Sequence, residues 1–323
     1  MTKTTKLWQK SGSQIHPAVN NYMISKNLDA DNKLLPFDVQ GSQAHAKMLG
    51  KIGLLDKKDV KAIVETLDEI LLKHQTGEFI LRPENEDVHT EIENYLVEKL
   101  GDVGKRVHVG RSRNDQVLTD LRLFTKAELH RVQEEIKVTA ETILDFARKH
   151  EFVPLPGYTH MQHAMPSSFG QWAGAFVESL INDHRVLDAA LMLNDQNPLG
   201  SGSGFGSAVP LDRQATTKEL GFERVQINPI YCQNSRGKIE AFTIAALSQV
   251  MMTLGKLAND LVIFYSQEFS FIKIDPSMTT GSSMMPQKRN LDIMEVLRAN
   301  VHVMQSLQQQ CETVGLNLIS GYN

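Results

Sequence analysis

Three long stretches of helical periodicity constrain the fold of this chain more than any other feature. Apolar residues recur at spacings of mostly three or four from Asp115 to about His150, from Ser167 to Leu193, and from Lys238 to about Glu268. Helices of roughly 30 residues reach about 45 Å and are far longer than the average helix of a globular protein. Elements of this length pack as bundles. The sequence therefore predicts a mainly α fold built on a long-helix bundle.

Shorter elements precede and follow these three. One amphipathic stripe predicts a helix over Asp59–Lys73, and Arg82-Pro83-Glu84 is typical of a helix start. Another helix is expected after Asn290. Strand-like runs are few, and Arg106–Val109 is the best candidate. The stretch from Pro154 to His160 is expected to be a loop between two long helices.

The chain of 323 residues is long for a single core. Mixed short elements give way to long helices near Gly110. We therefore expect an N-terminal mostly helical domain over residues 1–110 and a central long-helix bundle domain over residues 111–323.

Charge and composition exclude several functional classes. The net charge is −4 with both signs interspersed, so no basic face for nucleic acid is expected. Cys232 and Cys311 are too few and too far apart for a disulfide framework or a zinc site. The longest uncharged stretch, Ala241–Gly255, is shorter than the roughly 20 apolar residues that span a bilayer. The N-terminus has no apolar core typical of a signal peptide, so a cytoplasmic protein without membrane contact is predicted.

The segment Gly281–Asn290, with the sequence GSSMMPQKRN, carries the strongest chemical signal. It places two hydroxyls, a proline, cations and an amide in a glycine-led loop between two helical patterns. Backbone N–H groups and a lysine in such a loop can bind a carboxylate while a hydroxyl is held over the neighbouring carbon. Abstraction of a proton next to a carboxylate needs this arrangement. The alternative is a solvated turn whose Gly and Ser provide backbone freedom.

Two further clusters lie at helix starts. In Asn85–Thr90, His89 occupies a polar first turn, where a surface histidine is the default interpretation. Gly110–Gln116 offers two guanidinium groups, a hydroxyl and amides, which suits carboxylate binding at a helix N-terminus. A capping segment with solvated arginines is the alternative interpretation of this cluster.

Two other segments resemble known sites only superficially. His160 and His163 could share a face of a helix, but no carboxylate or cysteine stands at a metal-ligand offset, so no metal site is predicted. Glycines at 200, 202, 204 and 206 do not fit G-x-G-x-x-G, and no phosphate-binding loop or nucleophile-elbow motif occurs. A flexible connector is the favoured interpretation of residues 197–210.

Gly281–Asn290 matches G-S-S-x-M-P-x-K-x-N, the signature loop of the fumarase/aspartase superfamily, at every specified position. Within that superfamily the chain resembles the argininosuccinate lyase family over essentially its whole length. The segments that carry this resemblance are Asp38–Ser42 with a helix expected after it, Glu86–Thr90, Gly110–Gln116, Gly157–His160 and Met285–Lys288. The resemblance implies a fumarase/aspartase-like bundle, homotetramers with active sites shared between subunits, and no metal or organic cofactor.

The resemblance also implies roles for individual residues. Ser282 matches the catalytic base, and Lys288 a residue that polarises the substrate carboxylate. His160 matches a histidine with an acid–base role, supported by an acid that corresponds to Glu295. The positions that match substrate-binding residues are His89, Ser112, Arg113, Asn114, Thr159, Asn290 and Tyr322.

Some segments depart from the family pattern. A serine is usual where this chain has Ile24–Asn27, and only the arginine of Ser-Asp-Arg-Asp is kept in Asn234–Gly237. Met165 replaces a glutamine after the Thr-His pair. Family members continue beyond Tyr322-Asn323 with a small helical domain, so the chain is expected to lack its C-terminal end.

The function implied is base-catalysed β-elimination of argininosuccinate to arginine and fumarate, in arginine biosynthesis. Two alternatives stay open from the sequence. One is another fumarate-releasing lyase of the superfamily, such as an adenylosuccinate lyase-like enzyme. The other is a non-catalytic crystallin-like homologue on the same scaffold.

Overall fold

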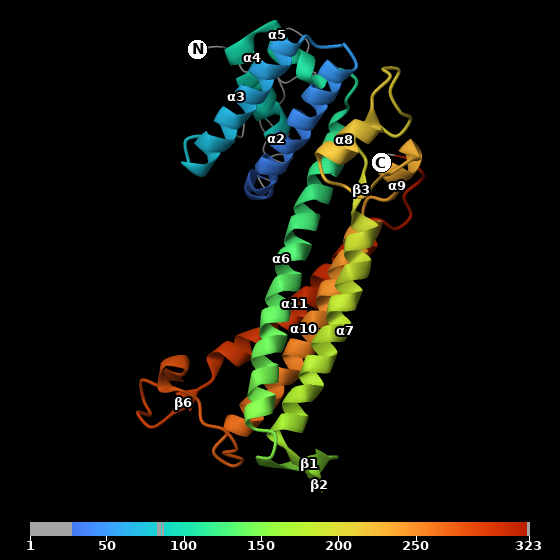
Figure 1. Ribbon diagram of the computed structural model, residues 1–323. Coiled ribbons are helices and arrows are strands. Elements are labelled where there is room, and N and C mark those ends of the chain that lie inside the picture. Colours follow the sequence, from blue (N-terminus) through green and yellow to red (C-terminus); the bar gives the residue numbers. More distant parts are fainter. Residues whose placement is uncertain (1–27, 83–84, 86, 322–323) are drawn as a thin grey trace. The chain divides into compact units, whose positions relative to one another are not determined.

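The computed structural model describes residues 28–82, 85 and 87–321. These residues form two compact units (Figure 1). The first unit comprises residues up to 127, 194–236 and the segment from 318, and the second comprises 128–193 and 237–317. The long helix α6 thus contributes to both. The compact units are defined by contacts, whereas the boundary expected near residue 110 separates parts that would fold independently. That boundary stays a prediction.

The first unit is built mainly from short and medium helices. A parallel pair of very short strands, β3 and β4, completes it. Its elements are α2 (Leu28–Lys51), α3 (Lys57–Gln75), α4 (Val88–Leu100), α5 (Asp102–Lys105), the 3-10 helix η2 (Arg106–His108), the first part of α6 (Arg113–Lys149), β3 (Gln196–Asn197), α8 (Arg213–Glu219), β4 (Arg224–Val225) and α9 (Pro229–Asn234).

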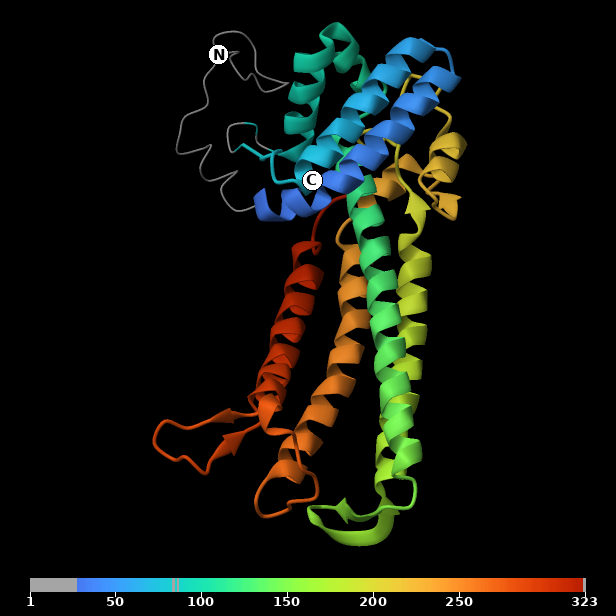
Figure 2. The same cartoon turned by 60° about the vertical axis from the view of Figure 1, so that its left-hand side comes forward.

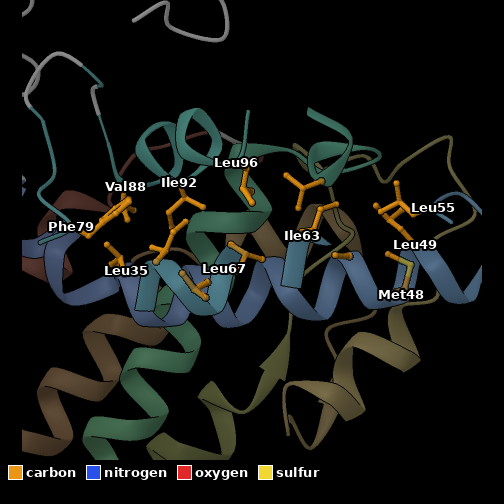
Figure 3. Packing of buried hydrophobic residues seen from close by; sticks show 14 of the residues in the cluster. Leu35, Met48, Leu49, Leu55, Ile63, Leu67, Phe79, Val88, Ile92 and Leu96 are labelled. Carbon is orange, nitrogen blue, oxygen red and sulfur yellow. The ribbon is translucent and has the colours of Figure 1, made fainter. Parts of the chain in front are cut away.

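The main core of this unit lies between α2, α3 and α4 (Figure 3). Leu35 of α2, Leu67 of α3 and Leu96 of α4 are fully buried in it. Their helices each present apolar residues at spacings of three and four, which is why the three faces can close on one another. A smaller core around Leu123, Leu199 and Phe222 lies beside the first turns of α6.

The second unit contains the long helices, two short antiparallel strand pairs and one 3-10 helix. In both views α10 and α11 run side by side (Figures 1 and 2). The elements are the rest of α6, β1 (Pro154–Thr159), β2 (Gln162–Ser168), α7 (Phe169–Asn194), α10 (Lys238–Tyr265), the 3-10 helix η3 (Pro276–Met278), β5 (Thr280–Gly281), β6 (Arg289–Asn290) and α11 (Asp292–Val314).

Packing in the second unit joins α6, α7 and α10 through Leu129, Leu187 and Val250. Helices α10 and α11 approach closely at Gly255, where a Cβ would lie 2.8 Å from Val301 Cγ2. Among the described helices, α10 is the one long and apolar enough to cross a membrane by length and composition. Its residues Ala246 and Val250 are buried in this core, as in the central helix of a bundle.

Several sequence predictions are confirmed and others are wrong. The long helices and the helix over Asp59–Lys73 lie where expected. Arg106–Val109 is not a strand, because Val107 packs into the first core as part of a helical turn. The helix expected from Arg82 begins at Val88, with Asp87 as its N-cap; Pro83 and Glu84 lie outside the described residues.

Two segments expected to be loops or helix flanks have regular structure. Pro154–His160 forms strand β1 and its turn, because the chain pairs with residues 162–168 as an antiparallel hairpin. Asp38–Ser42 does not precede a helix but lies within α2.

Candidate active site

A buried polar cluster occupies the first unit; it consists of Asp38, Ser42, His89, Arg111, Asp115, Gln116 and Asp120. Its centre is a hydrogen bond between His89 Nδ1 and Asp38 Oδ2. The other carboxylate oxygen of Asp38 accepts hydrogen bonds from Ser42 Oγ at 3.1 Å and Gln116 Nε2 at 2.8 Å. His89 is therefore a buried, oriented side chain, and the default interpretation as a surface histidine is wrong.

Charge in this cluster is distributed unequally between two aspartates. Burial favours the neutral form of Asp38, but the charge and hydrogen bond of His89, followed by Arg111, hold its pKa below the ordinary value. Burial, reinforced by the negative charge of Asp38, raises the pKa of Asp120 well above its ordinary value. Within the part of the chain that the structure describes, neither carboxylate oxygen of Asp120 has a hydrogen-bond partner. Asp38 thus carries the charge, and Asp120 favours the protonated form.

Asp38, His89 and Asp120 also bring three potential metal-ligand atoms within 4.8 Å of one another. His89 Nδ1 lies 3.7 Å from Asp120 Oδ2 and is already hydrogen-bonded to Asp38. His89 Nδ1 and Asp38 Oδ2 are therefore hydrogen-bonded to each other, while the carboxylate of Asp120 lies beside this pair. The chemistry that this arrangement supports is orientation of an imidazole by a carboxylate, as in other His–Asp pairs.

Three of the predicted substrate-binding residues lie at the start of α6: Ser112 directly precedes the helix, and Arg113 and Asn114 are its first two residues. Ser112 Oγ accepts the Asn114 N–H at 3.3 Å, while Asp115 Oδ1 accepts the Ser112 N–H at 2.9 Å. This is a reciprocal helix cap of the capping-box type. Arg113 donates to Thr90 Oγ1 at 2.9 Å and pairs with Asp87 at 3.0 Å. The capping interpretation is confirmed, but the arginines are not solvated.

Arg113 therefore links the first turn of α6 to the first turn of α4, which carries His89. The backbone carbonyl of Asn114 also accepts a hydrogen bond from Arg236 at 2.8 Å. Arg236 is the arginine kept from the family pattern, and its neighbour Asn234 accepts the Gly321 N–H at 2.6 Å. Tyr322, Glu86 and Ile24–Asn27 lie outside the described residues.

In the second unit, His160 forms the turn of the β1–β2 hairpin. His160 and Met161 have φ angles of 52° and 59°, a left-handed conformation that is uncommon outside glycine. Both are exposed. Thr159 is the strand residue before the turn and pairs with Gln162. Because this segment is a hairpin, His160 and His163 do not share a helix face as a metal pair would require.

The segment Gly281–Asn290 forms the end of a second hairpin. Strands β5 and β6 pair antiparallel at its base. Ser282 Oγ accepts hydrogen bonds from the N–H groups of Met284 and Met285, each at 3.3 Å. Lys288 is exposed, and Asn290 is half-buried at the base. The hydroxyl of Ser282 therefore lies over a tight turn, with its lysine directed to solvent.

Glu295 lies in the first turn of α11 and is exposed. It lines a groove of about 540 Å³ between α10 and α11, together with Lys256, Arg298 and His302. Arg298 donates to Asn259 Oδ1 at 3.1 Å across this groove. Glu295 thus faces a basic rim within the second unit.

The structure brings only some of the predicted residues together. The β1–β2 hairpin and the β5–β6 hairpin lie toward the same end of the long helices (Figure 2). Among the described residues, no hydrogen bond or ion pair joins His160 or Thr159 to Ser282, Lys288 or Asn290. His89, Ser112, Arg113 and Asn114 form a separate connected group. The predicted residues thus fall into two regions.

Sequence reasoning assigned no role to Asp38, Asp115 or Asp120. A signal for two of them was present, since Asp115 and Asp120 interrupt the apolar pattern of α6 and are fully buried. Charged residues are rarely fully buried unless they are paired or functional. The hydrogen bonds that join Asp38 to His89 and Gln116, and Asp115 to Gly200 and Gly202, link segments far apart in the sequence, and no local pattern predicts those pairings.

Comparison with known proteins gives consistent results. The family model described as lyase matches residues 13–305. An argininosuccinate lyase of Phocaeicola vulgatus is 44% identical over 317 residues, which cover 98% of this chain and 71% of that protein. An argininosuccinate lyase of Thermotoga neapolitana is 41% identical over 318 residues, covering 98% of this chain and 80% of that protein.

Solved structures show the same fold. EDDS lyase in complex with formate superposes with a TM-score of 0.83 at 24% identity, and the match covers 96% of this chain and 62% of that one. A fumarate lyase:delta crystallin from Brucella melitensis bound to cobalt gives a TM-score of 0.77 at 20% identity, covering 92% and 70%. The predicted mainly α bundle is confirmed. The chain spans about three fifths of the EDDS lyase chain.

Proposed function

This chain belongs to the argininosuccinate lyase family of the fumarase/aspartase superfamily, and on that premise we propose that it cleaves argininosuccinate into arginine and fumarate. This is the last step of arginine biosynthesis. The observation that carries the proposal is the Gly281–Asn290 hairpin, whose Ser282 hydroxyl and Lys288 ammonium belong to one exposed turn. The substrate is a small molecule, as in the relatives whose names state it.

The reaction is a β-elimination. Ser282 as alkoxide takes the proton from the carbon beside a carboxylate, and the electron pair of that C–H bond forms the new C=C bond. The C–N bond breaks, its electron pair goes to the guanidinium nitrogen, and an acid protonates that nitrogen. We assign the acid role to His160 with Glu295, and stabilisation of the dianionic intermediate to Lys288 and Asn290.

Serine is a poor base, so its environment must change. Its pKa has to fall by roughly five units, about 7 kcal/mol at 1.36 kcal/mol per unit. One exposed lysine contributes only about 0–1 kcal/mol, because water screens it. The turn must therefore close over substrate in a site shielded from water, with Gly281 as a hinge.

Exposed apolar surfaces of the second unit support the idea that neighbouring subunits cover the active site. Helix α11 has no buried residue, although it carries exposed apolar side chains such as Ile293, Val296 and Val303. An apolar groove of about 340 Å³ lined by Leu180, Val250 and Met304, among others, is also open. Such faces are typical of surfaces covered by a partner. We propose a homotetramer whose active sites are shared between subunits. The substrate-binding residues of each active site are then His89, Ser112, Arg113, Asn114, Thr159 and Tyr322.

The proposed enzyme is cytoplasmic, uses no metal or organic cofactor, and binds neither nucleic acid nor membranes. The interspersed charges and the net charge of −4 support the expectation for nucleic acid.

The proposal is tested by incubating the full-length protein with argininosuccinate and, separately, with adenylosuccinate, and measuring fumarate release. We expect turnover of argininosuccinate alone. Turnover of adenylosuccinate instead would show a different lyase of the superfamily, and absence of turnover from a folded tetramer would show a crystallin-like homologue. Light scattering coupled to size-exclusion chromatography measures the tetramer in the same sample.

A further inference from the structure

The carboxylate of Asp115 joins two distant segments of the first unit. It is fully buried, and among the described residues its hydrogen-bond donors are backbone N–H groups. Oδ1 accepts the Ser112 N–H at 2.9 Å. Oδ2 accepts the N–H groups of Gly200 at 2.9 Å and Gly202 at 2.8 Å, which lie 85 and 87 residues further along the chain.

The glycine-rich loop, residues 200–206, is not a flexible connector. Arg213, just beyond the loop, donates to the carbonyl of Leu199 at 2.9 Å and to that of Asn197 at 3.1 Å. Gln233 donates to the carbonyl of Gly202 at 3.3 Å. The loop is therefore held by side chains on one side and by Asp115 on the other. This corrects the expectation from the sequence.

Glycine is required where the loop meets Asp115. Gly202 has a φ of 62°, and a Cβ there would lie 2.7 Å from the carbonyl oxygen of Gly206. A side chain at this position would force the loop to open. The left-handed backbone at Gly202 is thus part of what directs its N–H group to the carboxylate.

A capping role alone does not account for this geometry. The reciprocal cap of α6 uses Oδ1 of Asp115 and the hydroxyl of Ser112. Oδ2 takes no part in the cap and accepts the N–H groups of Gly200 and Gly202 in the loop instead. Burial raises the pKa of Asp115, and the N–H donors of Gly202 and Ser112 oppose that shift.

We propose that Asp115 is a positioning residue that couples the glycine-rich loop to the turn of Ser112, Arg113 and Asn114. The loop then sets where these three residues meet substrate. The inference rests on the proposed function, because the turn is a substrate site only there. We assign Asp115 a positioning role because, among the described residues, the hydrogen bonds of its carboxylate come from backbone N–H groups.

The test uses Asp115→Asn, Gly202→Ala and the double variant in the full-length protein. An asparagine keeps the size but offers one acceptor oxygen, so either the cap or the loop loses its partner. We expect each single variant to raise KM for argininosuccinate about tenfold with kcat changed less than threefold, since uniform substrate binding is lost. The double variant is expected to match the larger single effect, because both changes break one connection.

Asp212→Asn is the matched control. Asp212 caps α8 by accepting the Ala215 N–H at 2.9 Å and lies outside the proposed site. It should leave KM unchanged. The coupling would be overturned if the increase in KM of the double variant equalled the product of the two single increases. It would also be overturned if Asp115→Asn had the same KM as the parent protein.

Hydrogen–deuterium exchange separates this inference from the proposed function. Asp115→Asn should speed exchange at the amides of Gly200 and Gly202 at least tenfold, whether or not the protein turns over argininosuccinate. Faster exchange in a protein with no turnover would leave the coupling standing while the proposed function fails. Unchanged exchange would overturn the coupling. If Asp115→Asn does not fold, Gly202→Ala gives the same readout through the remaining amides of the loop.

Discussion

The buried polar cluster of the first unit and the β5–β6 hairpin of the second unit differ in the burial of their polar side chains and in the hydrogen bonds that orient them. Asp38 has partners on both oxygens, and its neighbour His89 is almost inaccessible. The hydrogen bonds that the Ser282 hydroxyl makes to described residues come from the backbone of its own turn, and Lys288 is exposed. One region is preorganised within a single chain. The other carries the proposed catalytic side chains on an exposed turn that is not shielded from water.

This difference separates binding from chemistry. A preorganised cluster suits recognition, because its side chains do not have to be ordered when substrate arrives. Proton abstraction by serine needs a dry and positive surrounding, which an exposed turn acquires only on closure. Changes in the first region should therefore alter stability as well as binding. Loss of the Ser282 hydroxyl in the second region should alter the chemical step.

The largest effect is expected at the second region. Ser282→Ala should lower kcat for argininosuccinate by about 10²–10⁴-fold, the usual contribution of a general base, with substrate affinity little changed. Steady-state kinetics and calorimetric binding measure the two quantities. Ser283→Ala is the matched control, because that neighbouring serine is exposed and carries no proposed role. Equal losses in both variants would remove the distinction between the two hydroxyls.

Removal of a buried charge should give the next largest effect, and in the first region only. Asp38→Ala leaves Ser42, Gln116 and His89 without an acceptor, so the free energy of unfolding should fall by about 3–5 kcal/mol. Urea unfolding measures it. Lys288→Ala should change the same quantity by less than about 0.5 kcal/mol, because the side chain is exposed. Similar losses of unfolding free energy in the two variants would show that both side chains contribute equally to the stability of the fold.

Acid should weaken the first region through His45. Burial, followed by the positive charge of Arg111, lowers the pKa of His45 to about 3. The unfolded chain binds this proton near pH 6.5, so folded-state stability is lost as the pH falls below that value. Between pH 7 and 4.5 the loss should be about 2–3 kcal/mol.

His45→Gln tests the assignment of that acid sensitivity. Glutamine can still donate to the Val109 carbonyl, which His45 Nε2 contacts at 2.9 Å, but it does not titrate. The variant should therefore show a smaller difference in urea midpoint between pH 7 and 4.5. An unchanged pH dependence would place the sensitivity elsewhere in the chain.

The smallest effect is expected for an exposed hydrogen bond in the second unit. Tyr158 OH and His163 Nε2 lie 2.8 Å apart across the β1–β2 hairpin. Tyr158→Phe should change the free energy of unfolding by less than about 1 kcal/mol, since water replaces the lost bond. Thermal unfolding detects this. A loss comparable to that of Asp38→Ala would show that the hairpin is as rigid as the buried cluster.

The sequence predicted the long helices because their apolar spacing depends only on the helix itself. It did not predict the β1–β2 hairpin, since Pro154, Pro156 and Gly157 are typical of irregular loops and the turn uses two left-handed residues that are not glycine. The strand expected over Arg106–Val109 was wrong because burial of Val107 overrode its β propensity.

The candidate site was predictable to a similar degree. Family motifs indicated His89, Ser112, Arg113 and Ser282 as site residues. They did not indicate that His89 is bound by Asp38, or that Asp115 holds glycines more than eighty residues away. Such contacts depend on tertiary packing between elements, and no local spacing encodes them.

The central claim is that the Ser282 hydroxyl removes the substrate proton. The most direct measurement is a crystal structure of the full-length Ser282→Ala variant with argininosuccinate bound. We predict that the Cβ of residue 282 lies about 4–5 Å from the carbon that loses hydrogen, within reach of a hydroxyl at hydrogen-bonding distance. A substrate carbon beyond about 7 Å, with the β5–β6 hairpin closed, would contradict the account.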